Sequence, residues 1–281
     1  MFLSTNTAIY GLGLKPGEPD EYERVQRILG LGFKGLSIGE PPDGNWLRWR
    51  QALAPFAHLS CHAPFADLAL LSAHPGIRQV SLQDTLETFS TAFKLRGETV
   101  TIHPGQPSRS LAQERTDALM RELLLRIDQE AQNTGVWACW ETGTGYFVPL
   151  ERFDLLRELG LRQSGICLDV QHNMRVWRQI NPDDNIKTFA AFIHRYADLI
   201  KILHLGDWIE PAPRADGWND HHLVGRGMIP WPEVFASLVE VGYEGELCLE
   251  YHPDSFSSDE ELLDNLAYLR ALIAEAGGTV A

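Results

Sequence analysis

Six short β-rich segments of the sequence each end in a side chain that can bind a metal ion. These side chains are His62, His103, Glu141, Asp169, His204 and Glu250. If the segments are parallel strands of an α/β barrel, their carboxyl ends lie on one face, where the active sites of such barrels are built. A single His or acid at a strand end commonly caps a helix or faces solvent, whereas six in succession predict one shared site.

The three carboxylates among these residues would repel one another in a common pocket unless a cation neutralised them. Glu141, Asp169, His204 and Glu250 offer oxygen ligands and one nitrogen, a mixture that favours Mn²⁺, Mg²⁺ or Co²⁺ and does not exclude Zn²⁺. Adding His62 and His103 shifts the set toward imidazole, which favours zinc or more than one ion. Both possibilities stay open on the sequence.

Further polar residues follow the same strand ends. His172 stands three residues after Asp169, where it can reach a second metal ion or a substrate hydroxyl. The run Asn219-Asp220-His221-His222 offers additional ligands, of which His221 is a candidate. Arg226, between two glycines, is a candidate for binding a substrate oxyanion or phosphate.

Aromatic residues near the strand ends can wall a pocket and stack on sugar rings. Among them we expect Trp177 and Trp208 to contact a substrate. Most of the other tryptophans are expected in the core.

The elements that would position these residues alternate along the chain. Strands are predicted over Leu3–Tyr10, Gly35–Ile38, Leu59–His62, Thr99–His103, Trp137–Glu141, Gly165–Asp169, Ile200–His204 and Glu246–Glu250. Helices are predicted near 20–30, 46–54, 76–95, 110–133, 150–158, 184–197, 232–241 and 259–275, and Gly206 to Pro230 reads as one long irregular segment. Eight βα units without a dividing linker predict a single (β/α)₈ TIM barrel over residues 1–281. An open doubly wound sheet is the alternative, but Gly11-Leu12-Gly13 lacks the third glycine of a dinucleotide-binding loop.

Composition narrows the function classes. The chain has 281 residues and a formal net charge of −14, with 24 Lys and Arg against 38 Asp and Glu. Such acidity argues against general binding to nucleic acids or anionic membranes, although a local basic patch would be compatible with it.

No apolar run reaches membrane-spanning length and no basic leader begins the chain, so we expect a soluble cytoplasmic protein. The four cysteines form no CxxC pair and are expected to be buried thiols. The oligomeric state stays open, a homo-oligomer included.

The ordered motifs resemble the xylose isomerase-like barrel superfamily, which contains sugar and sugar-phosphate isomerases and epimerases and endonuclease IV. The matching segments are His62-Ala63-Pro64, His103-Pro104-Gly105, Glu141-Thr142 with Gly145, Leu168-Asp169-Val170-Gln171-His172, Lys201-Ile202-Leu203-His204-Leu205-Gly206-Asp207, Gly225-Arg226-Gly227 with Trp231, and Gly242-Tyr243 leading to Glu250. Each motif is weak alone, and the ordered set covers most of the chain.

The resemblance implies a divalent-metal-dependent isomerase or epimerase acting on a small polyhydroxy carbonyl compound. In such enzymes Glu141, Asp169, His204 and Glu250 would bind one ion, while Glu141 and Glu250 would move a proton through an enediolate. The residues then expected to contact the substrate are His62, His103, His172, Arg226, Trp177 and Trp208. A polyol dehydratase or lyase would use the same site, so the reaction subtype stays open.

Endonuclease IV is the alternative within the same resemblance, as a zinc-dependent enzyme that cuts abasic DNA. It would use His62, His103, His172 and His221 as ligands of further zinc ions. Asn219 stands where its pattern requires an Asp, which speaks against a third metal. A barrel that binds sugar or metal without turnover is the non-enzymatic alternative, and no position of the four-ligand set is lost.

Overall fold

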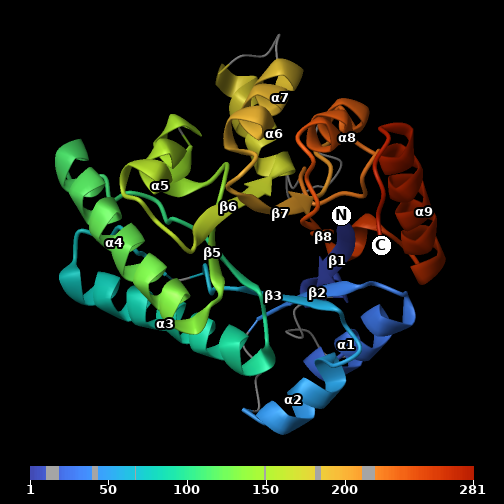
Figure 1. Ribbon diagram of the computed structural model, residues 1–281, viewed down its shortest axis with the longest axis horizontal. Coiled ribbons are helices and arrows are strands. Elements are labelled where there is room, and N and C mark those ends of the chain that lie inside the picture. The colour runs from blue at the N-terminus through green and yellow to red at the C-terminus, as the bar shows by residue number, and fades with distance from the viewer. Residues whose placement is uncertain (11–18, 40–43, 67, 149, 181–184, 211–218) are drawn as a thin grey trace. The chain divides into compact units, whose positions relative to one another are not determined.

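The computed structural model describes residues 1–10, 19–39, 44–66, 68–148, 150–180, 185–210 and 219–281. Within these residues eight parallel strands follow one another in chain order and close into a barrel (Figure 1). The strands are β1 (Phe2–Asn6), β2 (Gly35–Ile38), β3 (His58–His62), β4 (Thr99–Ile102), β5 (Trp137–Glu141), β6 (Ser164–Asp169), β7 (Ile200–Leu205) and β8 (Glu246–Leu249). The predicted α/β class and (β/α)₈ TIM barrel are confirmed.

Each strand is followed by at least one helix. The described helices are α1 (Glu21–Gly30), α2 (Trp46–Leu53), α3 (Pro75–Leu95), α4 (Gln113–Thr134), α5 (Asp154–Glu158), α6 (Val170–Ile180), α7 (Asn185–Tyr196), α8 (Trp231–Glu240) and α9 (Asp259–Glu275). Short 3₁₀ turns are η1 (Thr7–Tyr10), η2 (Gly145–Phe147), η3 (Leu150–Phe153) and η4 (Pro253–Ser255). None of the described helices combines the length and apolar character that crossing a membrane requires.

Some predicted boundaries were wrong. The first strand ends at Asn6, because the chain turns into η1 there, and β4 and β8 stop one residue before His103 and Glu250.

Helix α6 was not predicted at all. It begins directly after β6, and its first turn is capped by the Asp169 carboxylate, whose Oδ1 accepts the backbone N–H of His172 at 2.6 Å. An Asp at a strand end therefore also marks a helix start.

The described residues form two compact units: Met1–Ser37 with Ala52–Ala57 and Leu168–Ala281, and Ile38–Gln51 with His58–Cys167. A single domain over 1–281 stays a prediction. In the first unit β1 pairs with β2 through Ser4 and Gly35 and with β8 through Ser4 and Cys248, and β8 pairs with β7. The backbones of Met1 and Ala281 are joined by a hydrogen bond of 3.0 Å, so both chain ends lie beside β1 (Figure 1).

The second unit is built on the parallel strands β3, β4, β5 and the first part of β6. The long helices α3 and α4 run side by side along its outside (Figure 1). Met120, Leu124 and Ile127 lie on one face of α4 and are fully buried, as are Val100 of β4 and Ala138 of β5. The alternation of buried strands and amphipathic helices in the sequence therefore corresponds to real layers.

All four cysteines are unpaired with one another and buried, as predicted. Burial also raises the pKa of the Cys248 thiol well above its usual value, with the neighbouring Glu246 carboxylate acting in the same direction. Cys248 is therefore a neutral packing residue.

The long segment after β7 is irregular in its described parts, as predicted, and residues 211–218, which include Trp218, lie outside the described residues. Its organising group is the Asp207 carboxylate, which is fully buried. Each oxygen accepts two hydrogen bonds, from the backbone N–H groups of Trp208, Gly225 and Ile229 and the indole N–H of Trp231, at 2.8–3.2 Å. The backbone of Asp207 also pairs with that of His222. One side chain thus folds the two ends of the segment together, and Gly227 is required because a Cβ there would collide with the same carboxylate.

Replacing Asp207 by Asn should destabilise the protein by about 2–5 kcal/mol, because an amide NH₂ would face two buried N–H donors. Urea unfolding monitored by tryptophan fluorescence measures the change. Asp254→Asn is the matched control, since the Asp254 side chain is 63 % exposed. An unfolding midpoint of D207N equal to that of the wild type would contradict this role.

A second cluster of hydrogen-bonded side chains connects the first part of the chain to α9. Asp259 accepts hydrogen bonds from the Tyr10 hydroxyl at 2.7 Å and from the Arg27 guanidinium at 2.8 and 3.0 Å, and that guanidinium lies 3.9 Å from the centre of the Tyr10 ring. Burial alone would raise the pKa of Asp259, but the hydrogen bonds from Arg27 and Tyr10 outweigh it and leave this pKa below its usual value. The ionised carboxylate is the form that the fold stabilises.

Because the pKa of Asp259 is lowered by folding, the stabilisation is complete above its unfolded-state value of about 3.9 and is lost as the pH falls through the lower folded-state value. We expect Arg27→Gln to lower the unfolding free energy by roughly 1 kcal/mol or less at pH 7, since the Arg27–Asp259 pair is half exposed. Once Asp259 is protonated, the same substitution should not change the unfolding free energy measurably. Denaturant titrations across that pH range test this. Arg121→Gln, which breaks the exposed Arg121–Glu158 pair, is the control. A penalty for R27Q that does not shrink on acidification would refute the assignment.

Candidate metal centre

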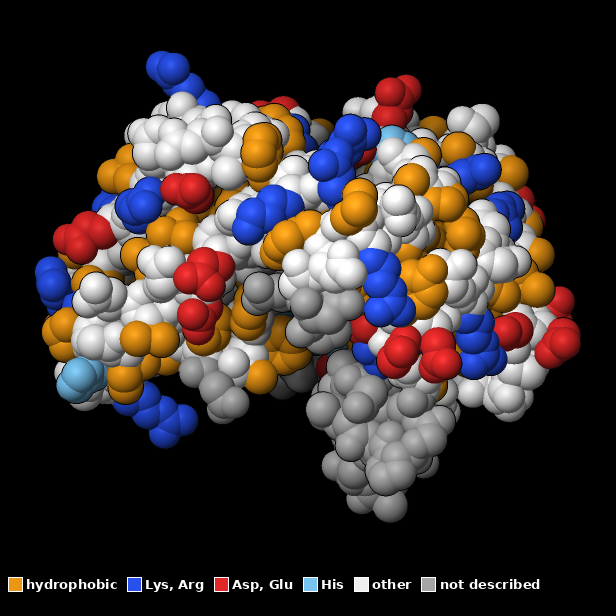
Figure 2. All heavy atoms as spheres, turned by 90° about the horizontal axis from the view of Figure 1, so that it is seen from below, with side chains coloured by type: hydrophobic (Ala, Val, Ile, Leu, Met, Phe, Trp, Pro, Cys, Tyr) orange, Lys and Arg blue, Asp and Glu red, His pale blue; other side chains and the backbone are white. Residues whose placement is uncertain are grey.

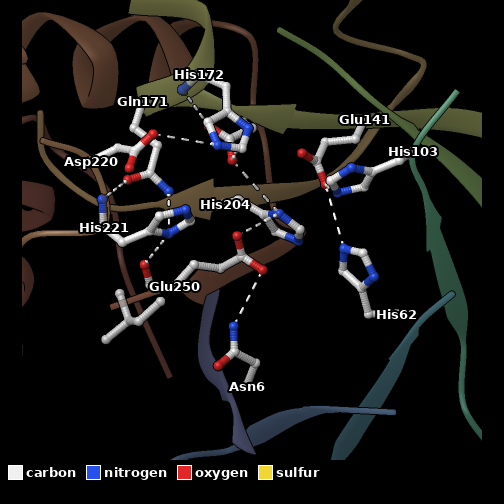
Figure 3. Close-up of polar contacts among 12 residues, drawn as sticks. Asn6, His62, His103, Glu141, Gln171, His172, His204, Asp220, His221 and Glu250 are labelled. Atoms are coloured by element: carbon white, nitrogen blue, oxygen red, sulfur yellow. Dashed lines mark hydrogen bonds and ion pairs between the residues drawn. The ribbon is translucent and has the colours of Figure 1, made fainter. Parts of the chain in front are cut away.

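Three side chains of the first unit converge at the carboxyl ends of its strands (Figure 3). Asp169 ends β6, His204 lies in β7 and Glu250 follows β8. The Nδ1 atom of His204 is 3.2 Å from Glu250 Oε2 and 4.0 Å from Asp169 Oδ2. Asp169 and His204 are almost fully buried, and one ligand atom from each residue lies within 4.8 Å of the others. Two carboxylates and an imidazole at this spacing fit a divalent cation, which would neutralise the buried negative charge.

Neighbouring groups orient both carboxylates. The Asn6 amide at the end of β1 donates to Glu250 Oε1 at 3.3 Å, while the backbone N–H of His172 holds Asp169 Oδ1. The other oxygen of each carboxylate is the one that faces His204. Such supporting hydrogen bonds fix the direction of metal ligands. Asn6 was missed by the sequence argument, because the first strand was predicted to continue to Tyr10 and Asn6 was therefore not recognised as a strand end.

A second group in the same unit consists of His172, Asp220 and His221, whose ligand atoms also lie within 4.8 Å of one another. His172 Nδ1 is 3.3 Å from Asp169 Oδ2, and His172 Nε2 is 3.8 Å from Asp220 Oδ2. The rings of His172 and His221 stand nearly perpendicular, with centroids 5.5 Å apart. Asn219 is not part of this group; the next residue, Asp220, supplies its carboxylate. Whether a further metal ion binds here stays a prediction.

In the second unit His62, His103 and Glu141 form a group of their own (Figure 3). Glu141 Oε2 is 3.0 Å from His103 Nε2 and 3.6 Å from His62 Nε2, and the carboxylate is buried. His62 Nδ1 donates to the carbonyl oxygen of Ala63 at 2.7 Å, which leaves an electron pair on Nε2 in the neutral ring. That electron pair faces a carboxylate oxygen, an arrangement that a cation between them would satisfy.

Arg226, Trp177 and Trp208, which were predicted to contact a substrate, and the aromatic residue Phe65 lie as follows. Phe65 is 61 % exposed and stacks on His103, with ring centroids 4.8 Å apart. Arg226 is exposed and pairs with Glu261 of α9 at 2.8 Å. Trp208 is buried beside Asp207, and Trp177 lies in α6 with a side chain outside the described residues. That Arg226, Trp177 and Trp208 contact a substrate stays a prediction.

The chain is similar in sequence to an uncharacterized protein, MJ1311, of Methanocaldococcus jannaschii. The two are 25% identical over 225 residues, which is 76% of this chain and 72% of the relative.

Solved structures share the fold at lower identity. The 3-keto-D-glucoside 4-epimerase YcjR of E. coli superposes with a TM-score of 0.75 at 17% identity, covering 96% of this chain and 99% of that one. A D-psicose 3-epimerase from Clostridium cellulolyticum H10, solved with D-tagatose, gives a TM-score of 0.73 at 17% identity, covering 97% and 99%. At these identities the likeness shows a common architecture.

The model of the family described as "Xylose isomerase-like TIM barrel" matches residues 25–272, which include all six of the strand-end side chains found in the sequence. This chain belongs to the xylose isomerase-like TIM barrel family.

Proposed function

We propose that the protein is a divalent-metal-dependent isomerase or epimerase of a small polyhydroxy carbonyl compound. The observation that carries this proposal is the Asp169–His204–Glu250 cluster, in which Asp169 and His204 are buried and His204 Nδ1 lies 3.2 Å from Glu250 Oε2. Two structural neighbours named as sugar epimerases support the substrate class.

Asp169, His204 and Glu250 would hold the ion. Glu141 is proposed as the fourth ligand, because it ends the strand that precedes the strand of Asp169 in the closed order. Oxygen-rich sets of this kind suit Mn²⁺, Mg²⁺ or Co²⁺. When bound, the ion would polarise the substrate carbonyl and an adjacent hydroxyl and so make the intervening C–H more acidic.

The proton is then moved by the protein's own carboxylates. Glu250, held in direction by Asn6, and Glu141 are the proposed base and acid at the substrate carbon. His62, His103 and His172 are proposed to bind substrate hydroxyls. Removal of a proton by one carboxylate and delivery of a different, solvent-derived proton to the opposite face by the other, protonated carboxyl group would invert the carbon, whereas delivery of a proton to the neighbouring carbon would isomerise the sugar. Loss of a hydroxyl instead would make the protein a dehydratase, and product analysis separates these outcomes.

A second candidate function is zinc-dependent cleavage of abasic DNA. The observation that favours it is the pair of His-rich groups, His62–His103–Glu141 and His172–Asp220–His221, because imidazole suits zinc. The charge distribution speaks against it. The net charge is −14, and on the face shown in Figure 2 the basic side chains drawn in colour are scattered among acidic and apolar ones. A DNA backbone is held by clustered Lys and Arg.

Metal content separates the two functions. We expect about one Mn²⁺, Mg²⁺ or Co²⁺ per chain in the purified protein by elemental analysis, and loss of that ion in Glu250→Gln. Asn6→Ala should weaken binding by about 10–100-fold, because it removes only a supporting hydrogen bond. Glu122→Gln, on the exposed face of α4, is the matched control. Two or three zinc ions per chain would contradict the single-metal mechanism and direct the work to abasic DNA.

Turnover of ketoses, followed by NMR on matched free and phosphorylated sugars, tests the reaction. We expect chelation to abolish activity and Mn²⁺ or Co²⁺ to restore it. Glu141→Gln and Glu250→Gln should each lower kcat by at least about 10²–10⁴-fold, the usual contribution of general acid–base catalysis, and loss of the ion in Glu250→Gln should lower it further. Solvent deuterium should enter the product at the reacting carbon. Full activity of either variant would exclude carboxylate-mediated proton transfer, and an epimerised product without deuterium would exclude proton exchange between two carboxylates.

A further inference from the structure

Gln171, in the first turn of α6, contacts His221 at two points (Figure 3). The backbone N–H of His221 donates to Gln171 Oε1 at 2.6 Å, and Gln171 Nε2 lies 2.9 Å from His221 Nδ1. A backbone N–H can only donate, so it fixes which end of the amide is the oxygen. The NH₂ group of Gln171 must therefore face Nδ1 of the imidazole.

The same Nδ1 atom lies 2.8 Å from the backbone carbonyl oxygen of Glu250. An NH₂ group offers only donors and a carbonyl only accepts, whereas one nitrogen of a neutral imidazole is either a donor or an acceptor. Gln171 requires an electron pair on Nδ1, and the Glu250 carbonyl requires a proton there. The two neighbours thus favour opposite tautomers of His221.

The burial of Gln171 decides between the two tautomers of His221. Gln171 is fully buried, so water cannot take over as acceptor for its NH₂ group. In folded proteins, buried N–H groups that lack an acceptor are rarer than buried carbonyl oxygens that accept fewer hydrogen bonds than their two electron pairs allow. The electron pair therefore sits on Nδ1 and the proton on Nε2.

The backbone around the contact between Gln171 and His221 holds both residues in place. His221 has a φ of 59°, in the left-handed region that residues other than glycine seldom adopt. Its carbonyl accepts the backbone N–H of His252 at 2.8 Å, while the next residue is paired with Asp207. On the other side β7 is followed by Gly206, where a Cβ would collide with the Gln171 amide.

We propose that Gln171 is a positioning residue that keeps His221 in the Nε2-protonated tautomer, as a hydrogen-bond donor rather than a metal ligand. His172 and Asp220 then lack the third ligand that a further ion needs. The contrast within the chain is His62, whose Nδ1 donates to a carbonyl and whose Nε2 is left as a ligand. That the His221 proton is donated to a substrate oxygen rests on the function proposed above, while the tautomer does not.

The tautomer can be read directly by ¹⁵N NMR of the full-length protein labelled at histidine, with His221 assigned by comparison with His221→Asn. We expect the wild-type ring to carry its proton on Nε2. In Gln171→Glu the carboxylate can accept both the backbone N–H and an Nδ1–H, and Gln171→Met removes the amide donor from Nδ1. The proton should therefore move to Nδ1 in both variants. A wild-type ring protonated on Nδ1 overturns the proposal, whether or not the variants fold.

Zinc titration followed by elemental analysis gives the second readout. Both Gln171 variants should bind about one zinc ion per chain more than the wild type, because a tetrahedral site needs the Nε2 electron pair of His221. Gln129→Glu, on the exposed face of α4, controls for the added charge. Wild-type protein that already holds zinc on His221, or variants that gain none, would refute the role of Gln171. If no sugar reacts while the tautomer is as expected, the proposed reaction is wrong and the inference about His221 stands.

Discussion

The arrangement of the first unit depends on one buried carboxylate that is not itself a metal ligand. Asp207 satisfies four N–H donors from both ends of the long segment after β7, and its backbone is paired with His222. Because a buried carboxylate is tolerated only when its electron pairs are occupied, any displacement of the segment would leave donors or acceptors unsatisfied. Asp220 and His221 are held in place by this requirement, so the described end of the segment that carries them is fixed by a buried group.

Much of the fold, and the place of the candidate ligands in it, could be predicted from the sequence. Glu141 and Asp169 end β5 and β6 as expected, and His204 lies one residue before the end of β7. They were identified because parallel strands share a direction, and that rule needs no knowledge of side-chain packing. Helix α6 could not be predicted, because its cap is the same Asp169 carboxylate that the strand pattern assigns to the site. Local sequence patterns assign one role to each residue, whereas Asp169 both caps α6 and is a candidate metal ligand.

The supporting residues escaped prediction for a different reason. Asn6 acts on Glu250 from the other end of the chain, and Gln171 acts on His221 across fifty positions of sequence. Neither side chain belongs to a type that indicates chemistry, since amides are abundant in turns and at helix starts. Their roles come from distance and direction alone. Asp220 illustrates the same limit, because a motif counted along the chain requires its acid at position 219, while the backbone turn at His221 brings the neighbouring side chain to His172.

The hydrogen bond between Asn6 and Glu250 joins residues 244 positions apart. Of the eight strands β1 is synthesised first, yet its two neighbours in the sheet include β8, the last of the eight to be synthesised. Contacts of such long range form late in folding, after the cost of closing the loop between them has been met. A chain that has been synthesised only as far as β7 lacks β8 and Glu250, and with them the group that Asn6 orients. The cluster of Asp169, His204 and Glu250 can therefore form only after β8 has been synthesised, although β6 and β7 already carry two of its three members.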